Sequence, residues 1–529
     1  MKRLLLVLLI IICTSAIHAQ NNNRTQKYIS DFNFLITKLI ETHPDPYSGF
    51  CDSIGFHSAK KECIASISKA YSNKEFVFIV NKFLSNLKDG HTYLQFQRSN
   101  NRNQYHFPLK FKASSNHIYI QNSNKEYQHL QGMVLLKVNK LPIKRLLEKA
   151  SHFQPAENYS GQQYNLIKIL HSDHLSQLFF EKSDTLTLTL RNQTGDFRNY
   201  KIPFLPKCKY LTQKSRIHTH NSNGLLDWSM IGKNGDIGYF RWNSILSREV
   251  VQNTYKSSPS WINGNINWAF SFLHEKRSTS IEENILKIPS LYEQFYLLAK
   301  ALKKRKSQHL IIDLRYNNGG MTPIVEPLLY ILYGDRYLSF DFNAQMIRRI
   351  SPLALNKMGY KSILEFNKKY GCNLKLGDFT FSQFGNFHHQ KSLEKRRSIA
   401  LNGYNGFGAK NLQKTPLLTS IKITVITSPE TFSAAYHFTY FLKKLGRTQI
   451  IGTPSRQAAN TFMETTQIVL PNTQLTGSIS NSKQILFKDT SIPQKDLKPD
   501  YNMSWEDFKL LNFDSNAEIL KALKIIESH

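Results

Sequence analysis

The spacing of hydrophobic positions changes twice along the chain, and the changes predict three regions after a short leader. From residue 24 to about 105, apolar side chains recur every three to four positions, which predicts helices over about 29–40, 59–72 and 75–87. From about 106 to 205 the period shortens to two, as in Leu186–Leu190, which predicts strands. From about 215 onward strands and helices alternate, which is typical of an α/β domain.

The last region contains the clearest strand and helix patterns. Short β-branched runs predict strands, and longer runs with helical spacing predict helices; the strands fall at about 235–242, 309–315, 421–427 and 449–451, and the helices at 290–303 and 434–444. The stretch from about 335 to 415 looks irregular, basic and aromatic, with several glycines. We interpret it as an insertion or lid over a site.

The first 19 residues have the pattern of a secretory signal. Lys2 and Arg3 precede the apolar run Leu4–Ile12, which is too short to span a bilayer, and small residues end it at Ala19. We expect cleavage near Ala19 and a periplasmic or secreted protein. Cys13 follows a bulky isoleucine, so a lipid anchor at that residue is disfavoured. No later run of apolar residues reaches 18, so no integral membrane segment is expected in the mature chain.

Composition and charge limit the classes of partner. The chain has 529 residues and a formal net charge of +31, but the basic residues are spread along it and no nucleic-acid motif accompanies them. We therefore expect no nucleic-acid partner, and basic faces that contact an anionic envelope or acidic peptides. No Cys-x-x-Cys or histidine-rich cluster predicts a metal, and no cofactor is expected. The sequence does not specify the oligomeric state.

Four cysteines remain after the leader, which allows three disulfide connectivities. They are Cys51, Cys63, Cys208 and Cys372. Cys51 and Cys63 are close in sequence and are candidates to pair in an oxidising compartment.

A serine lies where a strand gives way to a helix. The strand over 421–427 ends at a Ser-Pro-Glu turn, and a helix of small residues begins near Ser433. At such a place the helix dipole and the free amides favour a developing anion, so Ser433 is a candidate nucleophile with the amide of Ala434 as an oxyanion donor. The alternative is an ordinary N-cap serine. His91, in a turn between a predicted helix and a strand, is either a functional loop residue or simply exposed.

Five short motifs in a fixed order resemble those of the C-terminal processing, or tail-specific, serine peptidases and the related tricorn-core peptidases. They are Asp89-Gly90-His91-Thr92, Ile312-Asp313-Leu314-Arg315-x-Asn317-x-Gly319-Gly320, Thr431-Phe432-Ser433-Ala434-Ala435, Ile451-Gly452 and Lys498-Pro499-Asp500. The resemblance covers most of residues 25–505. It implies an α/β fold with a crotonase-like (ClpP/crotonase) core at 215–529, a helical N-terminal domain at 20–105 and a small PDZ-like β-rich module at 106–205.

A strand, an asparagine-containing turn and a short helix over 134–150 also resemble a PDZ module, which adds a peptide as an extra strand at a sheet edge. The family cleaves peptide bonds in partly unfolded or C-terminally presented polypeptides, so a polypeptide substrate is expected.

The resemblance also implies roles for individual residues. Ser433 would be the nucleophile, and Gly319 or Gly320 would form the oxyanion hole with the amide of Ala434. Asp313 and Arg315 would be a structural pair.

The general base separates two branches of the family. One branch uses a lysine, whose position here falls on Ala458, and the nearby Arg456 cannot replace it because a guanidinium does not deprotonate. We therefore expect His91 to be the base, with His437 as a competitor four residues after Ser433. The acidic third member is less defined: Gln494 lies close to its position, and Asp489 is the available carboxylate.

Two functions remain open from the sequence. One is a secreted serine endopeptidase that works through an acyl-enzyme. The other is a catalytically impaired, peptide-binding envelope protein of the same fold. An α/β-hydrolase esterase is disfavoured, because the residues around Ser433 lack the flanking glycines of a nucleophile elbow.

Overall fold

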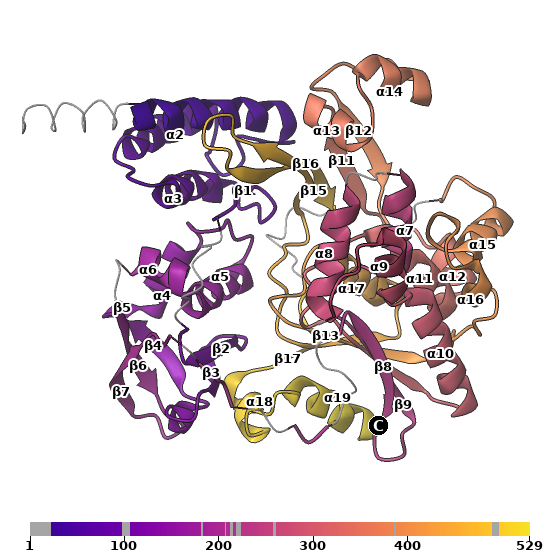
Figure 1. Cartoon of the computed structure of the whole chain (residues 1–529). Coiled ribbons are helices and arrows are strands. Elements are labelled where there is room, and N and C mark those ends of the chain that lie inside the picture. The colour runs from indigo at the N-terminus through magenta and orange to yellow at the C-terminus, as the bar shows by residue number, and fades with distance from the viewer. Residues whose placement is uncertain are drawn as a thin grey trace, which may run out of the picture.

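The computed structural model has a mixed α/β fold built on three β-sheets (Figure 1). It describes residues 23–97, 106–180, 184–206, 208–211, 215–217, 224–257, 261–273, 275–385, 388–488 and 497–528. The predicted leader with Cys13, and the candidate acids Asp489 and Gln494, lie outside these residues. Within them, no helix has the length and apolar character needed to cross a membrane.

The N-terminal region is helical, as predicted. Residues 23–42 form a helix, followed by α2 (Ser53–Ile67), α3 (Asn73–Leu84) and a 3₁₀ turn (Ser85–Leu87). The side chains of Asp52 and Ser72 cap α2 and α3 by accepting backbone N–H groups, which explains where the two helices begin. Their apolar faces share one hydrophobic cluster with Ile468 and Ile479 from near the other end of the chain.

The predicted β-rich module has a sheet with strand order β2-β3-β4-β6-β7, in which β5 pairs with β4. Its elements are β2 (Leu109–Ala113), β3 (Ile118–Ser123), β4 (Val134–Val138), β5 (Leu141–Pro142), α4 (Ile143–Ala150), α5 (Tyr159–His171), α6 (Asp173–Phe179), β6 (Thr185–Arg191) and β7 (Phe197–Pro203). The helix α5 packs beside the edge strand β2. Leucine and phenylalanine side chains from these elements form a hydrophobic cluster of their own.

The central sheet has strand order β17-β14-β13-β10-β9-β8, and all its neighbours are parallel except β8 against β9. Its strands are β8 (Leu226–Ile231), β9 (Ile237–Trp242), β10 (His309–Asp313), β13 (Lys422–Thr427), β14 (Thr448–Gly452) and β17 (Tyr501–Asn502). This confirms the predicted alternation of strands and helices. Because β10 and β13 are parallel neighbours, the loops after them leave the same edge of the sheet side by side.

Helices surround the central sheet (Figure 1). They are α7 (Arg248–Ser257), α8 (Ile262–Leu273), α9 (Ile281–Lys287), α10 (Leu291–Lys304), α11 (Glu326–Tyr333), α12 (Asp335–Ser339), α17 (Ala434–Leu445), α18 (Trp505–Leu510) and α19 (Ala517–Glu527). The helix α17, which follows the candidate nucleophile, is buried along nearly its whole length.

The third sheet joins distant parts of the chain. Its strands are β1 (Tyr93–Leu94), β11 (Gln345–Arg349), β12 (Phe379–Gln383), β15 (Thr461–Val469) and β16 (Thr476–Ile485). β16 pairs with β1, with β11 and with β15. It thereby fixes the segment after His91 to the C-terminal half of the molecule.

The prediction that residues 335–415 are irregular was wrong. The stretch contains α12, β11 and β12, and also α13 (Pro352–Lys357), α14 (Ile363–Tyr370), α15 (Leu393–Asn402) and α16 (Ala409–Leu412). These elements are short, and β12 is almost entirely exposed, so their hydrophobic period is weak.

The candidate Cys51–Cys63 disulfide is absent from the described residues, since both thiols are free. Cys51 is exposed just before α2, whereas Cys63 turns into the helical core, with its sulfur 3.9 Å from the carbonyl oxygen of Ile79. Burial raises the pKa of the Cys63 thiol to about 12, which makes it unreactive.

Candidate active site

Ser433 adopts a backbone conformation that serine rarely takes. Its φ is 54° and its ψ is −123°, between the end of β13 and the start of α17. The side chain makes no capping hydrogen bond, so the N-cap alternative does not apply. The turn before it is held from the neighbouring strand, because Thr431 Oγ1 donates to the carbonyl oxygen of Leu314 (2.8 Å) and the Phe432 amide donates to that of Asn317 (3.0 Å). Conformations of this kind concentrate at functional sites.

The loop after β10 reaches Ser433 through Gly319. A Cβ at this residue would lie 2.6 Å from Ser433 Cβ and 3.0 Å from the Ala434 nitrogen, and the φ of Gly319 is +101°. Only glycine permits this approach and this conformation.

The two glycines differ in the availability of their amides. The N–H of Gly319 donates to Asn317 Oδ1 (2.9 Å), while its carbonyl oxygen accepts from the amide of Ile245 (2.8 Å). Because a trans peptide directs N–H opposite to C=O, the N–H of Gly320 points away from Ile245. Within the described residues, neither the Gly320 N–H nor the Ala434 N–H has an acceptor. Gly320 and Ala434 therefore offer the two unused donors beside Ser433.

The structure brings His91 to the nucleophile loop from far along the sequence. Its ring stacks on that of Phe432, the residue before Ser433, with centroids 4.5 Å apart and planes inclined by 20°. The side chain of His91 is buried, and neither ring nitrogen has a hydrogen-bond partner among the described residues. The ring is therefore placed by stacking, with both nitrogens available.

Asp89 holds the turn that carries His91. One of its oxygens accepts the His91 amide (2.8 Å), and the other accepts Thr92 Oγ1 (2.5 Å) and lies 3.3 Å from His43 Nε2. Burial alone would raise the pKa of Asp89, but the hydrogen bonds and charges of its neighbours, chiefly His43, hold it below its usual value. Asp89 thus remains an anion that fixes the backbone.

Sequence reasoning missed Glu157. This residue lies before α5, next to Asn158, which caps that helix. The Glu157 carboxylate is buried, with Oε1 3.6 Å from His91 Nδ1 and Oε2 accepting the Ala458 amide (2.8 Å). An acidic residue before a helix is common, so the sequence held no signal for this contact.

The residues around the position of the missing lysine also contribute to the site. The backbone amide of Ala458 contacts Glu157, and the neighbouring Gln457 accepts the amide of Ser433 through Oε1. Gln457 is fully buried, so it fixes the backbone of the nucleophile rather than contacting solvent.

Arg456 extends the stack of rings toward the module. Its guanidinium carbon lies 4.3 Å from the Phe432 centroid and 4.0 Å from that of Tyr164 on α5. It also donates to Asn318 Oδ1 (2.7 Å), next to Gly319 and Gly320, which we call the glycine loop. Module, glycine loop and nucleophile turn therefore meet at this guanidinium.

His437, the competing candidate for the base, is engaged at both ring nitrogens. Its Nδ1 is 2.8 Å from Thr322 Oγ1 and its Nε2 is 2.8 Å from Gln484 Oε1, so both nitrogens are occupied. Burial lowers the pKa of His437 to about 4, which keeps the ring neutral near pH 7.

Asp89, His91 and Glu157 also bring three metal-type ligand atoms within 4.8 Å of one another. The carboxylate oxygens that face His91 already accept backbone N–H groups, from Gly90 to Glu157 and from His91 to Asp89. These two carboxylate oxygens are held by the turn, while the His91 ring nitrogens have no partner among the described residues, and we assign no metal to the cluster.

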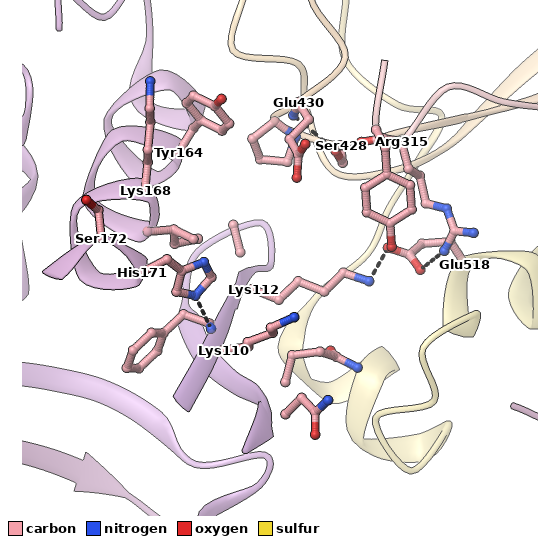
Figure 2. Close-up of a pocket in the computed structure, with 17 residues that line it drawn as sticks. Lys110, Lys112, Tyr164, Lys168, His171, Ser172, Arg315, Ser428, Glu430 and Glu518 are labelled. Carbon is pink, nitrogen blue, oxygen red and sulfur yellow. Dashed lines mark hydrogen bonds and ion pairs between the residues drawn. The ribbon is translucent and has the colours of Figure 1, made fainter. Parts of the chain in front are cut away.

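A cavity of about 740 Å³ lies between the module and the core (Figure 2). Lys110 and Lys112 on β2 and Lys168 on α5 line one side, and Glu430 and Glu518 line the other. Figure 2 shows Lys112 extending toward Glu518, and its Nζ is 2.6 Å from Glu518 Oε1.

Glu518 continues this contact into the core. Its Oε2 is 2.7 Å from Arg315 Nη1, and Arg315 in turn pairs with Asp313 (2.8 Å). The expected structural pair of Asp313 and Arg315 is thus present, and it forms part of a buried chain of charges that ends on the module.

One protein family matches the C-terminal part of the chain. The sequence model described as peptidase family S41 matches residues 284–503, which contain the glycine loop and Ser433. This match confirms the predicted relationship to the C-terminal processing peptidases. The chain carries a peptidase family S41 region and is a serine-type peptidase, a hydrolase. His91 and Glu157 lie outside the matched residues.

Two solved structures of CPAF share the fold of this chain. The structure of mature CPAF complexed with lactacystin has a TM-score of 0.55 at 15% identity and covers 94% of this chain and 99% of its own. Mature CPAF gives 0.56 at 16% identity, with 94% and 98% covered. A photosystem II D1 C-terminal processing protease gives 0.36 at 11% identity, with 92% and 94% covered. The search of curated proteins found no match to this chain.

Proposed function

We propose that the protein is a secreted serine endopeptidase in which Ser433 is the nucleophile and His91 the general base. The observation that carries this proposal is the strained backbone of Ser433, which lies in close contact with Gly319. The Ser433 hydroxyl does not cap the helix that follows. The stacking of His91 on Phe432 brings an imidazole to the same turn.

The reaction proceeds through an acyl-enzyme. His91 accepts the proton of Ser433 Oγ as this oxygen bonds to the substrate carbonyl carbon, and the N–H groups of Gly320 and Ala434 stabilise the oxyanion. The C–N bond then breaks, and the amine leaves with the proton from His91. Water, deprotonated by His91, attacks the ester, releases the acid and restores Ser433.

The substrate we propose is an unfolded or C-terminally presented polypeptide. A PDZ-like module at 106–205, a crotonase-like core at 215–529 and a lid within 335–415 belong to the same proposal. The lysines on the edge strand β2 support it, because a peptide added to that edge would bring its carboxylate near them. Export with cleavage near Ala19, Asp489 or Gln494 as a further member of the catalytic group, and envelope contact through basic faces complete it.

Substitution of each catalytic residue tests the mechanism. Ser433→Ala and His91→Ala should abolish cleavage of a disordered polypeptide while the thermal unfolding midpoint stays close to that of the wild type. A fluorophosphonate probe should label the wild type but not Ser433→Ala. Ser271→Ala and His57→Ala, which change exposed side chains on helices, are the matched controls. Full turnover in either catalytic variant would disprove the assignment.

The second candidate function is a peptide-binding protein that has lost efficient chemistry. It is favoured by one observation: within the described residues, His91 makes no hydrogen bond to Ser433. A wild-type protein that binds an unfolded polypeptide, yet neither cleaves it nor reacts with the fluorophosphonate, would support this function instead.

A further inference from the structure

We propose that Glu157 is the positioning carboxylate of His91, which orients the imidazole and stabilises the cation that forms when it accepts the serine proton. This inference rests on the proposed peptidase function. It concerns a residue outside the matched family region, on the segment between α4 and α5 of the β-rich module.

The contacts of Glu157 fix its carboxylate from two sides. Oε1 accepts the Gly90 amide (3.2 Å), in the turn that carries His91, and Oε2 accepts the Ala458 amide (2.8 Å), in the segment after β14. Glu157 is 4% exposed to solvent. A Cβ added to Gly90 would lie 2.9 Å from Glu157 Oε1, so only glycine leaves room for the carboxylate here. A carboxylate held in this way cannot turn away from the imidazole beside it.

The separation between Glu157 Oε1 and His91 Nδ1 is 3.6 Å. This is slightly longer than a hydrogen bond, and catalytic hydrogen bonds are often long before substrate binds. His91 Nδ1 has no other partner among the described residues. A small rotation of the ring on Phe432 would therefore make a bond from Nδ1–H to Glu157 and leave Nε2 to accept the serine proton.

The other charged groups around the ring are less suited to this role. Asp89 Oδ1 is farther, at 3.9 Å, and already accepts the His91 amide. His437 on α17 is neutral near pH 7, and Arg456, which also lies over the Phe432 ring, carries a positive charge that would oppose protonation of His91. Glu157 is thus the carboxylate that can compensate the imidazolium.

The origin of Glu157 gives this contact a second consequence. The carboxylate reaches the site from the module, whereas the nucleophile and the glycine loop belong to the central sheet. The orientation of His91 therefore depends on the contact between the segment before α5, which carries Glu157, and the segment after β14, which carries Ala458.

The experiment compares Glu157→Gln and Glu157→Asp with the wild type in the full chain. We measure kcat/KM against pH on a disordered polypeptide, and the rate of fluorophosphonate labelling. Glu157→Gln should lower both rates by up to about 10⁴-fold, the loss known when such a carboxylate is replaced by an amide. The acid limb of its pH profile, the fall in kcat/KM as His91 becomes protonated, should move to lower pH. The reason is that the imidazolium loses the negative charge that stabilises it. Glu157→Asp should recover part of the rate and keep the wild-type limb.

A buried carboxylate with similar contacts provides the control. Glu249 accepts hydrogen bonds from Ser247, Ser290 and the Leu291 amide, away from the site. Glu249→Gln should lower stability without moving the acid limb. If Glu157→Gln fails to fold, the pH profile of Glu157→Asp decides, because a shorter carboxylate should lower the rate while preserving the limb.

Different results overturn the two proposals. If the wild type is active and Glu157→Gln keeps both its rate and its acid limb, the role of Glu157 alone is overturned. If the acid limb shifts in Asp489→Asn instead, the role belongs to Asp489. A folded wild type that neither cleaves nor reacts with the probe would overturn the peptidase function and, with it, the role of Glu157.

Discussion

Ser433 and Gly319 are in contact although their loops are more than 100 residues apart in the chain. The backbone conformation of Ser433 costs free energy, of the order of 1–3 kcal/mol for a serine with positive φ, whereas glycine adopts the positive φ of Gly319 readily. The surrounding hydrogen bonds hold this conformation: Thr431 binds the end of the neighbouring strand, and Gln457 accepts the Ser433 amide. The hydroxyl is thereby fixed before any substrate arrives.

Gly319→Ala should therefore abolish activity. The new Cβ would lie 2.6 Å from Ser433 Cβ at a φ of +101°, so the two loops would have to separate. We expect fluorophosphonate labelling to slow by more than about 100-fold, comparable to the loss of an oxyanion donor. Gly377→Ala is the matched control, because Gly377 has a φ of +96° with nothing within 4 Å of its Cβ position. Equal labelling of both variants would contradict the role of the glycine loop.

At the scale of elements, buried charges join three parts of the fold. Arg315 follows β10, Glu518 lies on α19 and Lys112 on β2, and the three are linked by ion pairs (Figure 2). Burial alone would raise the pKa of Asp313, yet the Arg315 charge beside it holds that pKa well below its usual range. The same arginine accepts a hydrogen bond from Ser428 at its carbonyl oxygen, just before the nucleophile turn.

Glu518→Gln should destabilise the protein by about 3–5 kcal/mol, because it removes the anion shared by the buried Arg315 and the partly exposed Lys112. Urea unfolding followed by circular dichroism measures this loss. Glu148→Gln breaks the exposed pair with Arg145 and should change stability by less than about 0.5 kcal/mol. Similar losses in the two variants would show that the buried chain contributes little.

The elements also show which parts of the fold a sequence can reveal. The inner strands β9, β10, β13 and β14 of the central sheet were predictable because their apolar runs are largely buried on both faces, whereas β8 and β17 at its edges were not predicted. The helix α5 was missed because its sequence contains Gly161 and several amides, and β16 because it buries polar residues such as Ser480 and Gln484. Their burial depends on partners distant in sequence.

The same distinction applies to the site. Ser433, His91 and the two glycines were identifiable because each stands in a short motif. Glu157 and Gln457 were not, because their importance arises only when separate segments meet. Which glycine amide is free followed only from the hydrogen bonds of Asn317 and Ile245.

At the scale of the whole molecule, stability should depend on pH through His437. Its pKa is about 4 in the folded protein against an ordinary 6.5, so the unfolded chain binds the additional proton between these values. Stability is fully present above pH 6.5 and is lost as the pH falls toward 4, by about 3 kcal/mol at most.

Urea unfolding at a series of pH values tests this dependence. His437→Gln should be less stable at pH 7 but lose less stability on acidification, whereas His57→Gln, on an exposed histidine, should follow the wild type. An acid slope in His437→Gln equal to that of the wild type would assign the slope to other groups.

The pairing of β1 with β16 affects when the turn that carries His91 can form during synthesis of the chain. The turn that carries His91 is closed by Ser478, whose hydroxyl donates to the His91 carbonyl oxygen (2.6 Å) across 387 residues of chain. Ribosomes add about 5–20 residues per second, so roughly 20–80 s separate the synthesis of these two residues. During that interval the turn that carries His91 lacks β16, the strand with which β1 pairs, so His91 cannot reach its final position until nearly the whole chain has been made.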